Sequence, residues 1–127
     1  MKIHLPDNGH HWLLGMRIDV RSCRKAVSDI MRWSKQPSSS KYVCLANVHM
    51  CMEAYDDHVF RDVVNNADLV LPDGIPLVWF LHLYKHDAAT QVRGTDLLMM
   101  TCSEAARNGT PIGLYGGTPP SLQNYIL

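Results

Sequence analysis

The stretch Ala67-Asp68-Leu69-Val70-Leu71-Pro72-Asp73-Gly74 decides the fold class of this chain. Its apolar residues predict a buried strand over residues 68–71, and the Pro and Gly that follow predict a turn into a helix over residues 75–85. Ligands of open parallel sheets bind outside the carboxyl ends of the strands, so Asp73 is a candidate site residue. The alternative is that Asp73 only caps the helix that follows, a role for which Asp is favoured.

Strand-like and helix-like segments alternate along the rest of the sequence. Further strands are expected over residues 12–18, 42–46 and 112–115. Helices are expected over residues 19–34, 48–55 and 57–66, and from the Arg93-Gly94-Thr95-Asp96 segment to Asn108, with Gly109 as the left-handed C-cap. This alternation predicts βαβ units, and hence an α/β fold with a mainly parallel sheet and helices on both faces.

The C-terminal end of the sequence interrupts this pattern. Pro119 or Pro120 suits the first turn of another helix, whose apolar face would include Tyr125 and Ile126. A doubly wound sheet normally continues with strands beyond its crossover point. We therefore expect one α/β domain over residues 1–127 that is incomplete at its C-terminus.

Composition narrows the class of protein. A content of 46% hydrophobic and 19% charged residues is typical of a globular domain. Lys+Arg and Asp+Glu number 12 each, so no broad cationic field favours nucleic acid as a partner. The four cysteines form no C-x-x-C pair, and residues 1–10 contain no apolar signal-peptide core, which favours a cytoplasmic protein. No stretch approaches the roughly 20 apolar residues that crossing a bilayer requires.

Asn47 and Arg93 are further candidates for ligand binding. Asn47 ends the strand predicted over residues 42–46, so it lies beside Asp73 if the two strands are neighbours; an Asx-turn or a helix cap is the alternative. Arg93 stands next to Gly94 at a helix N-terminus, where a guanidinium binds an anionic group through two hydrogen bonds. A solvated surface charge is the alternative for Arg93.

Gly116 and Gly117 follow one predicted strand and precede a helix. Their backbone N–H groups are candidates for binding a phosphate at the positive end of that helix. The spacing does not match the G-x-G-x-x-G pattern of nicotinamide sites, and a tight turn is the alternative. His82 and His86 stand one helical turn apart, but no H-E-x-x-H pattern or neighbouring Cys completes a ligand set, so no metal or other cofactor is predicted.

Four blocks of the sequence together resemble the WecG/TagA/CpsF glycosyltransferases. In chain order they are Ala46-Asn47-Val48-His49-Met50, then Phe60-Arg61 followed after five residues by Ala67-Asp68-Leu69-Val70-Leu71-Pro72-Asp73-Gly74, then Val92-Arg93-Gly94-Thr95-Asp96, then Leu114-Tyr115-Gly116-Gly117-Thr118-Pro119. The order and spacing of the blocks carry the resemblance. It runs from about Leu14 to the last residue and covers the first half of a family member.

The resemblance implies a Rossmann-like α/β core and a metal-independent transferase at the cytoplasmic face of the membrane. Such an enzyme moves an N-acetylmannosamine-type sugar from a UDP donor to an undecaprenyl-diphosphate-linked acceptor, during cell-surface polysaccharide or teichoic acid assembly. Peripheral contact with the inner face of the cell membrane is therefore expected. The missing second half predicts very low transferase activity for this chain alone.

The resemblance also assigns roles to residues. The family's proposed base, the Asp of its D-G motif, falls on Asp73, with Gly74 beside it as a substrate-binding residue, and its strand-end Asn falls on Asn47. An inverting transfer needs a base for the acceptor hydroxyl, and the departing UDP needs positive groups, for which Arg93 and the Gly116-Gly117 turn are candidates. Many members have Thr where this chain has Leu45, which removes one polar contact to the sugar or acceptor.

Two other functions remain open from the sequence. One is a non-catalytic fragment or subunit that binds a nucleotide sugar or pairs with a separately encoded second half. The other is an unrelated nucleotide-binding enzyme that uses the Gly116-Gly117 turn. In a remnant of this kind, an unpaired sheet edge would favour a homo-oligomer.

Overall fold

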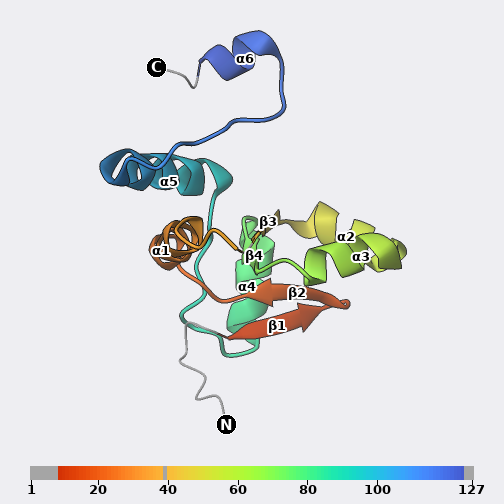
Figure 1. Ribbon diagram of the computed structural model, residues 1–127. Helices are drawn as coiled ribbons and strands as arrows, with labels where there is room; N and C mark the ends of the chain where they lie inside the picture. Colours follow the sequence, from red (N-terminus) through yellow and green to blue (C-terminus); the bar gives the residue numbers. More distant parts are fainter. Residues whose placement is uncertain (1–8, 39, 125–127) are drawn as a thin grey trace.

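A computed structural model describes residues 9–38 and 40–124 (Figure 1). The elements in chain order are β1 (His10–Leu13), β2 (Met16–Asp19), α1 (Cys23–Ser34), β3 (Val43–Ala46), α2 (Val48–Asp56), α3 (His58–Asn65), β4 (Leu69–Pro72), α4 (Ile75–Leu83), α5 (Gly94–Asn108) and α6 (Pro119–Gln123). The predicted α/β class is confirmed. The described residues do not include the apolar positions Tyr125 and Ile126. They also leave out most of residues 1–10, the stretch that contains no apolar signal-peptide core.

Strands β3 and β4 form the parallel pair that the sequence predicts. Val43 pairs with Leu69 and Ala46 with Pro72, so the two strands end level with each other. Helices α2 and α3 make the connection between them. The predicted βαβ arrangement is therefore confirmed for the stretch that decides the fold class.

The expectation of one opening strand over residues 12–18 is wrong, because the chain folds back on itself there. Leu14 and Gly15 both take positive φ values, 50° and 86°, and form the turn between β1 and β2. The two strands pair antiparallel, with Leu13 opposite Met16. Among the described residues the strands thus form one antiparallel and one parallel pair.

The strand predicted over residues 112–115 is also absent from the structure. These residues are exposed, they adopt no regular secondary structure, and Tyr115 is fully accessible to solvent. A strand forms only where its backbone N–H and C=O groups find partners on a neighbouring strand, and no described strand pairs with this segment. An apolar pattern alone therefore does not make a strand here.

Helices cover both faces of the parallel pair, as predicted (Figure 1). Side chains alternate along β4, so Val70 packs into one cluster while Leu69 and Leu71 pack into another. The Val70 cluster contains buried residues of β2, α2, α3 and α4. The Leu69 and Leu71 cluster contains buried residues of α1 and α5.

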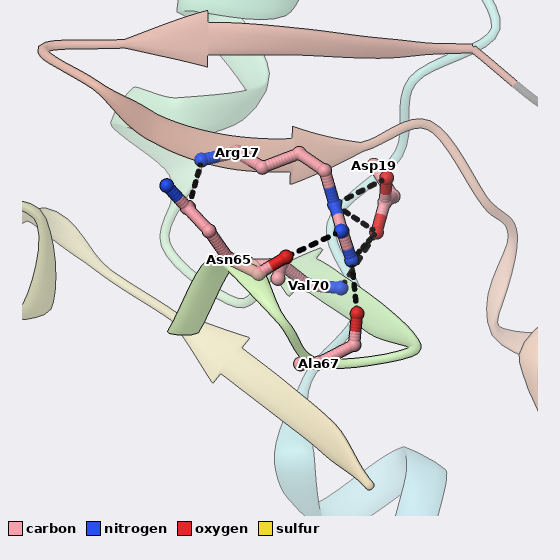
Figure 2. Close-up of polar contacts among 5 residues, drawn as sticks. All are labelled: Arg17, Asp19, Asn65, Ala67 and Val70. Atoms are coloured by element: carbon pink, nitrogen blue, oxygen red, sulfur yellow. Dashed lines mark hydrogen bonds and ion pairs between the residues drawn. The ribbon is translucent and has the colours of Figure 1, made fainter. Parts of the chain in front are cut away.

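An ion pair on β2 joins the hairpin to the chain entering β4 (Figure 2). The Arg17 guanidinium contacts the Asp19 carboxylate at 3.2 Å and donates hydrogen bonds to the carbonyl oxygens of Asn65, at 2.7 Å, and Ala67. Asp19 Oδ2 accepts a hydrogen bond of 2.7 Å from the backbone N–H of Val70. The two side chains thus satisfy backbone groups on both sides of the turn that leads into β4.

We expect Gly109→Ala to lower the free energy of unfolding by about 1 kcal/mol, because an L side chain is strained in the left-handed region. Gly109 is the predicted C-cap of α5, with φ 65°, and a Cβ atom there would meet no atom within 4 Å. The loss would therefore come from the backbone alone. Gly113→Ala is the matched control, since that position is equally open but has no positive φ. Urea unfolding that shows equal losses in both variants would contradict the prediction.

Candidate functional site

The carboxyl ends of β3 and β4 form the edge at which the candidate residues meet. The backbone N–H groups of Asp73 and Gly74 both donate to the Ala46 carbonyl, at 2.9 and 3.3 Å. A Cβ atom on Gly74 would lie 3.6 Å from both Cα and Cβ of Asn47. Asn47 and the Asp73-Gly74 turn are therefore adjacent, because the two strands are neighbours in register.

Asp73 does not cap the helix that follows it. The N-cap of α4 is Gly74, and no side chain makes a capping hydrogen bond there. Asp73 is partly buried, and within the described part of the chain its carboxylate accepts no hydrogen bond and meets no cation at ion-pair distance. Neither carboxylate oxygen is therefore occupied by a partner among the described residues.

The Asp73 carboxylate lies against the start of α5. A Cβ atom on Gly94 would come within 3.7 Å of Asp73 Oδ2 and 3.0 Å of Leu45 Cδ1. The second distance is tighter than nine in ten real Cβ contacts, so a larger residue at position 94 would require the Leu45 side chain to shift. Arg93, the N-cap of α5, is exposed beside this contact and makes no capping hydrogen bond.

Asn47 caps α2, so the capping role considered for it is present in the structure. Its Oδ1 accepts a hydrogen bond of 2.9 Å from the backbone N–H of Met50. The residue is exposed, and among the described residues its Nδ2 group donates to no acceptor. The cap fixes the amide in place and leaves its donor side open.

Three helix N-termini converge on this edge. Helix α2 begins after Asn47, α4 after Gly74 and α5 after Arg93. The N-termini of α4 and α5 lack side-chain caps. The first N–H groups of α5 are open to an anionic ligand, whereas α4 offers only the Ile75 N–H, because Pro76 has none and the Leu77 N–H donates to the Gly74 carbonyl at 3.2 Å. Helix N-termini attract anions through these N–H groups and through the helix dipole.

Gln91 belongs to this edge and was missed in the sequence. Its Nε2 group donates to the Asp73 carbonyl oxygen, and the next residue, Val92, donates from its backbone N–H to the Pro72 carbonyl at 2.9 Å. Gln91 thus fixes the backbone carbonyl group of Asp73. Its only distinguishing feature in the sequence is that it directly precedes the Val92-Arg93-Gly94 block, and this does not indicate which way its amide points.

Gly116 and Gly117 are not brought to this edge. They adopt positive φ values of 106° and 71° in an exposed bend that follows no strand. Figure 1 shows this segment leading away from β3 and β4, beyond α5. The expectation that these glycines follow a strand is therefore wrong, and they contribute no contact to the Asp73 edge in this structure.

The histidines considered as metal ligands are engaged separately. His82 Nε2 lies 2.8 Å from the Ala89 carbonyl, and His86 Nε2 lies 3.3 Å from Nδ1 of His11. Burial lowers the pKa of His86, and the nearby His11 and His10 lower it further. Within residues 9–38 and 40–124, no group of three or more His, Cys, Asp or Glu side chains is placed to hold a metal ion.

The sequence from residue 11 to residue 126 matches a known protein family, described as the glycosyl transferase WecG/TagA/CpsF family. The match spans β1 to α6 and so includes every residue of the strand-end site described above. It agrees with the resemblance carried by the four sequence blocks. The chain therefore belongs to the WecG/TagA/CpsF family of glycosyltransferases.

Proposed function

We propose that the chain carries the catalytic edge of an inverting transferase with Asp73 as its general base. The proposed reaction moves an N-acetylmannosamine-type sugar from a UDP donor to an undecaprenyl-diphosphate-linked acceptor. Membership of the family supports glycosyl transfer in cell-surface polysaccharide synthesis. The observation that supports the finer assignment is the open Asp73 carboxylate at the converging helix N-termini.

The proposed chemistry is a single displacement. The acceptor hydroxyl oxygen forms a bond to the anomeric carbon of the donor while the bond from that carbon to the UDP oxygen breaks. The hydroxyl proton moves to the Asp73 carboxylate, and UDP leaves with the bonding electron pair. A carboxylate within hydrogen-bond reach of the hydroxyl is sufficient for this proton transfer.

The departing diphosphate needs positive groups at the same edge. The uncapped N-terminus of α5 supplies several backbone N–H groups, α4 supplies that of Ile75, and Arg93 supplies a guanidinium. Such prearranged donors stabilise charge that develops in the transition state. The open Nδ2 group of Asn47 is suited to orient a sugar hydroxyl, and Gly74 lets a substrate approach the backbone closely.

The proposed place of action is the cytoplasmic face of the cell membrane. Among the helices that the structure describes, none combines the length and the apolar character needed to cross a bilayer. Access to a lipid-linked acceptor then requires contact with the membrane surface. In this proposal the folded domain itself makes the contact with the membrane surface.

Calorimetric titration with UDP and with NAD tests the proposed donor class. We expect UDP to bind and NAD to bind at least tenfold more weakly, because no Gly-rich nicotinamide motif follows a described strand. Addition of a UDP-sugar and a lipid-linked acceptor should then release UDP. A preference for NAD would contradict the transferase, and UDP binding without any release of UDP, in a version completed with the second half of a family member, would favour a non-catalytic subunit that binds nucleotide sugars.

A further inference from the structure

Helix α4 ends in a backbone motif that fixes the position of His86. The Lys85 N–H donates to the His82 carbonyl at 3.0 Å, and the His86 N–H donates to the Leu81 carbonyl at 2.9 Å. These two bonds form a Schellman motif, which most often has glycine at the position that Lys85 occupies here. Lys85 takes a positive φ of 64°, a conformation that strains an L side chain. The chain turns sharply at this residue, and the turn fixes the backbone of His86.

The His86 ring meets the His11 ring of β1. His86 Nε2 lies 3.3 Å from His11 Nδ1, and the two ring centroids are 5.4 Å apart. The His11 ring also contacts Tyr84 and Phe80, with centroid distances of 4.3 and 5.5 Å. A Cβ atom on Gly9 would lie 3.5 Å from His86 Cε1, so the chain entering β1 passes beside this ring. The histidine pair thus joins β1 to the C-terminal end of α4, the end opposite Gly74.

Few other contacts hold β1 to the rest of the protein. In the described part of the chain β1 pairs with β2 alone, and no side chain of β1 is fully buried. Only His11 and Leu13 of β1 are even partly buried. Strand β2, in contrast, buries Met16 and Ile18 completely. Loss of the His11–His86 contact would therefore loosen β1 while β2 stays in the core.

We propose that the His11–His86 pair is an acid-sensitive latch between β1 and α4. The hydrogen bond between the rings needs a proton on one of the two facing nitrogens and a lone pair on the other. One added proton is accommodated on an outward-facing nitrogen, and the negative end of the α4 dipole favours that charge. When both rings are protonated, two N–H groups face each other and two positive charges repel at short range. The bond is then lost and the latch opens.

The ionisable residues nearest the pair come from β1 and from the end of α4: His10, Tyr84, Lys85 and Asp87. The phenol of Tyr84 is neutral near pH 6, whereas Lys85 adds a positive charge. Asp87 favours a charged His86 ring, but it is the weakest of the influences on the pKa of His86. No other carboxylate in the described structure lies at ion-pair distance from either ring. The surroundings therefore do not neutralise a doubly protonated pair.

The direction of the pH response follows from His86. Burial lowers the pKa of His86 from its ordinary value of 6.5, and the charges of His11 and His10 lower it further. A lowered pKa means that the closed latch binds fewer protons than the open one. The closed form is therefore favoured above pH 6.5 and is lost as the pH falls through the lowered pKa of His86. This response does not depend on the proposed transferase reaction.

Hydrogen exchange followed by mass spectrometry at about pH 7.5 and about pH 5 tests the latch in the whole chain. After correction for intrinsic exchange rates, we expect the protection of the β1 amides to fall about tenfold more than that of the α1 amides, since one pKa unit is a factor of ten. His86→Gln keeps a neutral side chain that donates and accepts hydrogen bonds, so its β1 protection should be the same at both pH values. His86→Lys carries a charge at both pH values and should leave β1 weakly protected throughout.

The controls separate the latch from other effects of acid. His58→Gln removes an exposed histidine at the start of α3 and should respond to pH like the wild type. His11→Gln should behave like His86→Gln, because either change prevents the double charge. The α1 amides report unfolding of the whole domain. Equal pH dependence of β1 protection in wild type and His86→Gln, or equal loss of protection in β1 and α1, would overturn the inference.

Discussion

Replacing Asp73 by Asn is expected to lower the rate of sugar transfer by about 10²- to 10⁴-fold, the usual contribution of a general base. Asn has nearly the same shape but cannot accept the acceptor's proton. Because the Asp73 carboxylate caps no helix and pairs with no cation in the described structure, folding should be unaffected. In a version of the protein completed with the second half of a family member, release of UDP from a UDP-sugar in the presence of a lipid-linked acceptor measures the rate, and calorimetry with UDP measures donor binding.

Asp96→Asn is the matched control for this variant. Asp96 lies in the first turn of α5, two residues after Gly94, and is exposed. Asp96 therefore lies at the helix N-terminus that the Asp73 carboxylate approaches, but its own backbone does not contact the carboxyl ends of β3 and β4. Its replacement should change the transfer rate less than threefold. Full activity in Asp73→Asn, or loss of folding in that variant, would remove Asp73 from the role of base.

Asp19→Ala is expected to lower the free energy of unfolding by about 3–5 kcal/mol, as the loss of one partner of a buried ion pair does. The Asp19 and Arg17 side chains are only 14% and 18% exposed. The substitution leaves the Arg17 guanidinium without its counter-charge and the Val70 N–H without its acceptor. Urea or thermal unfolding followed by circular dichroism measures the loss.

Two further variants separate the ion pair from general effects of substitution. Glu104→Ala breaks an exposed pair with Arg107, for which we expect a loss of about 0.5 kcal/mol or less. Arg17→Met/Asp19→Ala removes both charges and should be more stable than Asp19→Ala alone, since no unpaired charge stays buried. An Asp19→Ala protein as stable as Glu104→Ala would show that the contact of Figure 2 does not hold the hairpin.

Local patterns predicted much of this structure. The apolar run before Pro72 gave the right strand, the Pro-Asp-Gly turn gave the right helix start, and Gly109 ends α5 as expected. Each of these features depends on residues within one turn or strand of each other. Periodicity and turn chemistry act over the same short range, which is why they were sufficient.

Features that depend on distant partners were not predicted. The run over residues 12–18 has strand-like composition throughout, and only the positive φ at Leu14 and Gly15 divides it into a hairpin. The segment over residues 112–115 is apolar but finds no strand to pair with in the described structure. In the same way, the bond from Gln91 to the Asp73 carbonyl joins residues 18 positions apart, and no local pattern encodes it.

One guanidinium holds together parts of the chain that lie about fifty positions apart. Arg17 on the hairpin bonds to the backbone at Asn65 and Ala67, just ahead of the strand that ends at the Asp73-Gly74 turn. The hairpin and that strand therefore cannot open independently, because both lose the same bonds when either one separates. A substitution that destabilises the hairpin would therefore also unfold β4 and displace the Asp73 carboxylate, although it changes no residue of the proposed site.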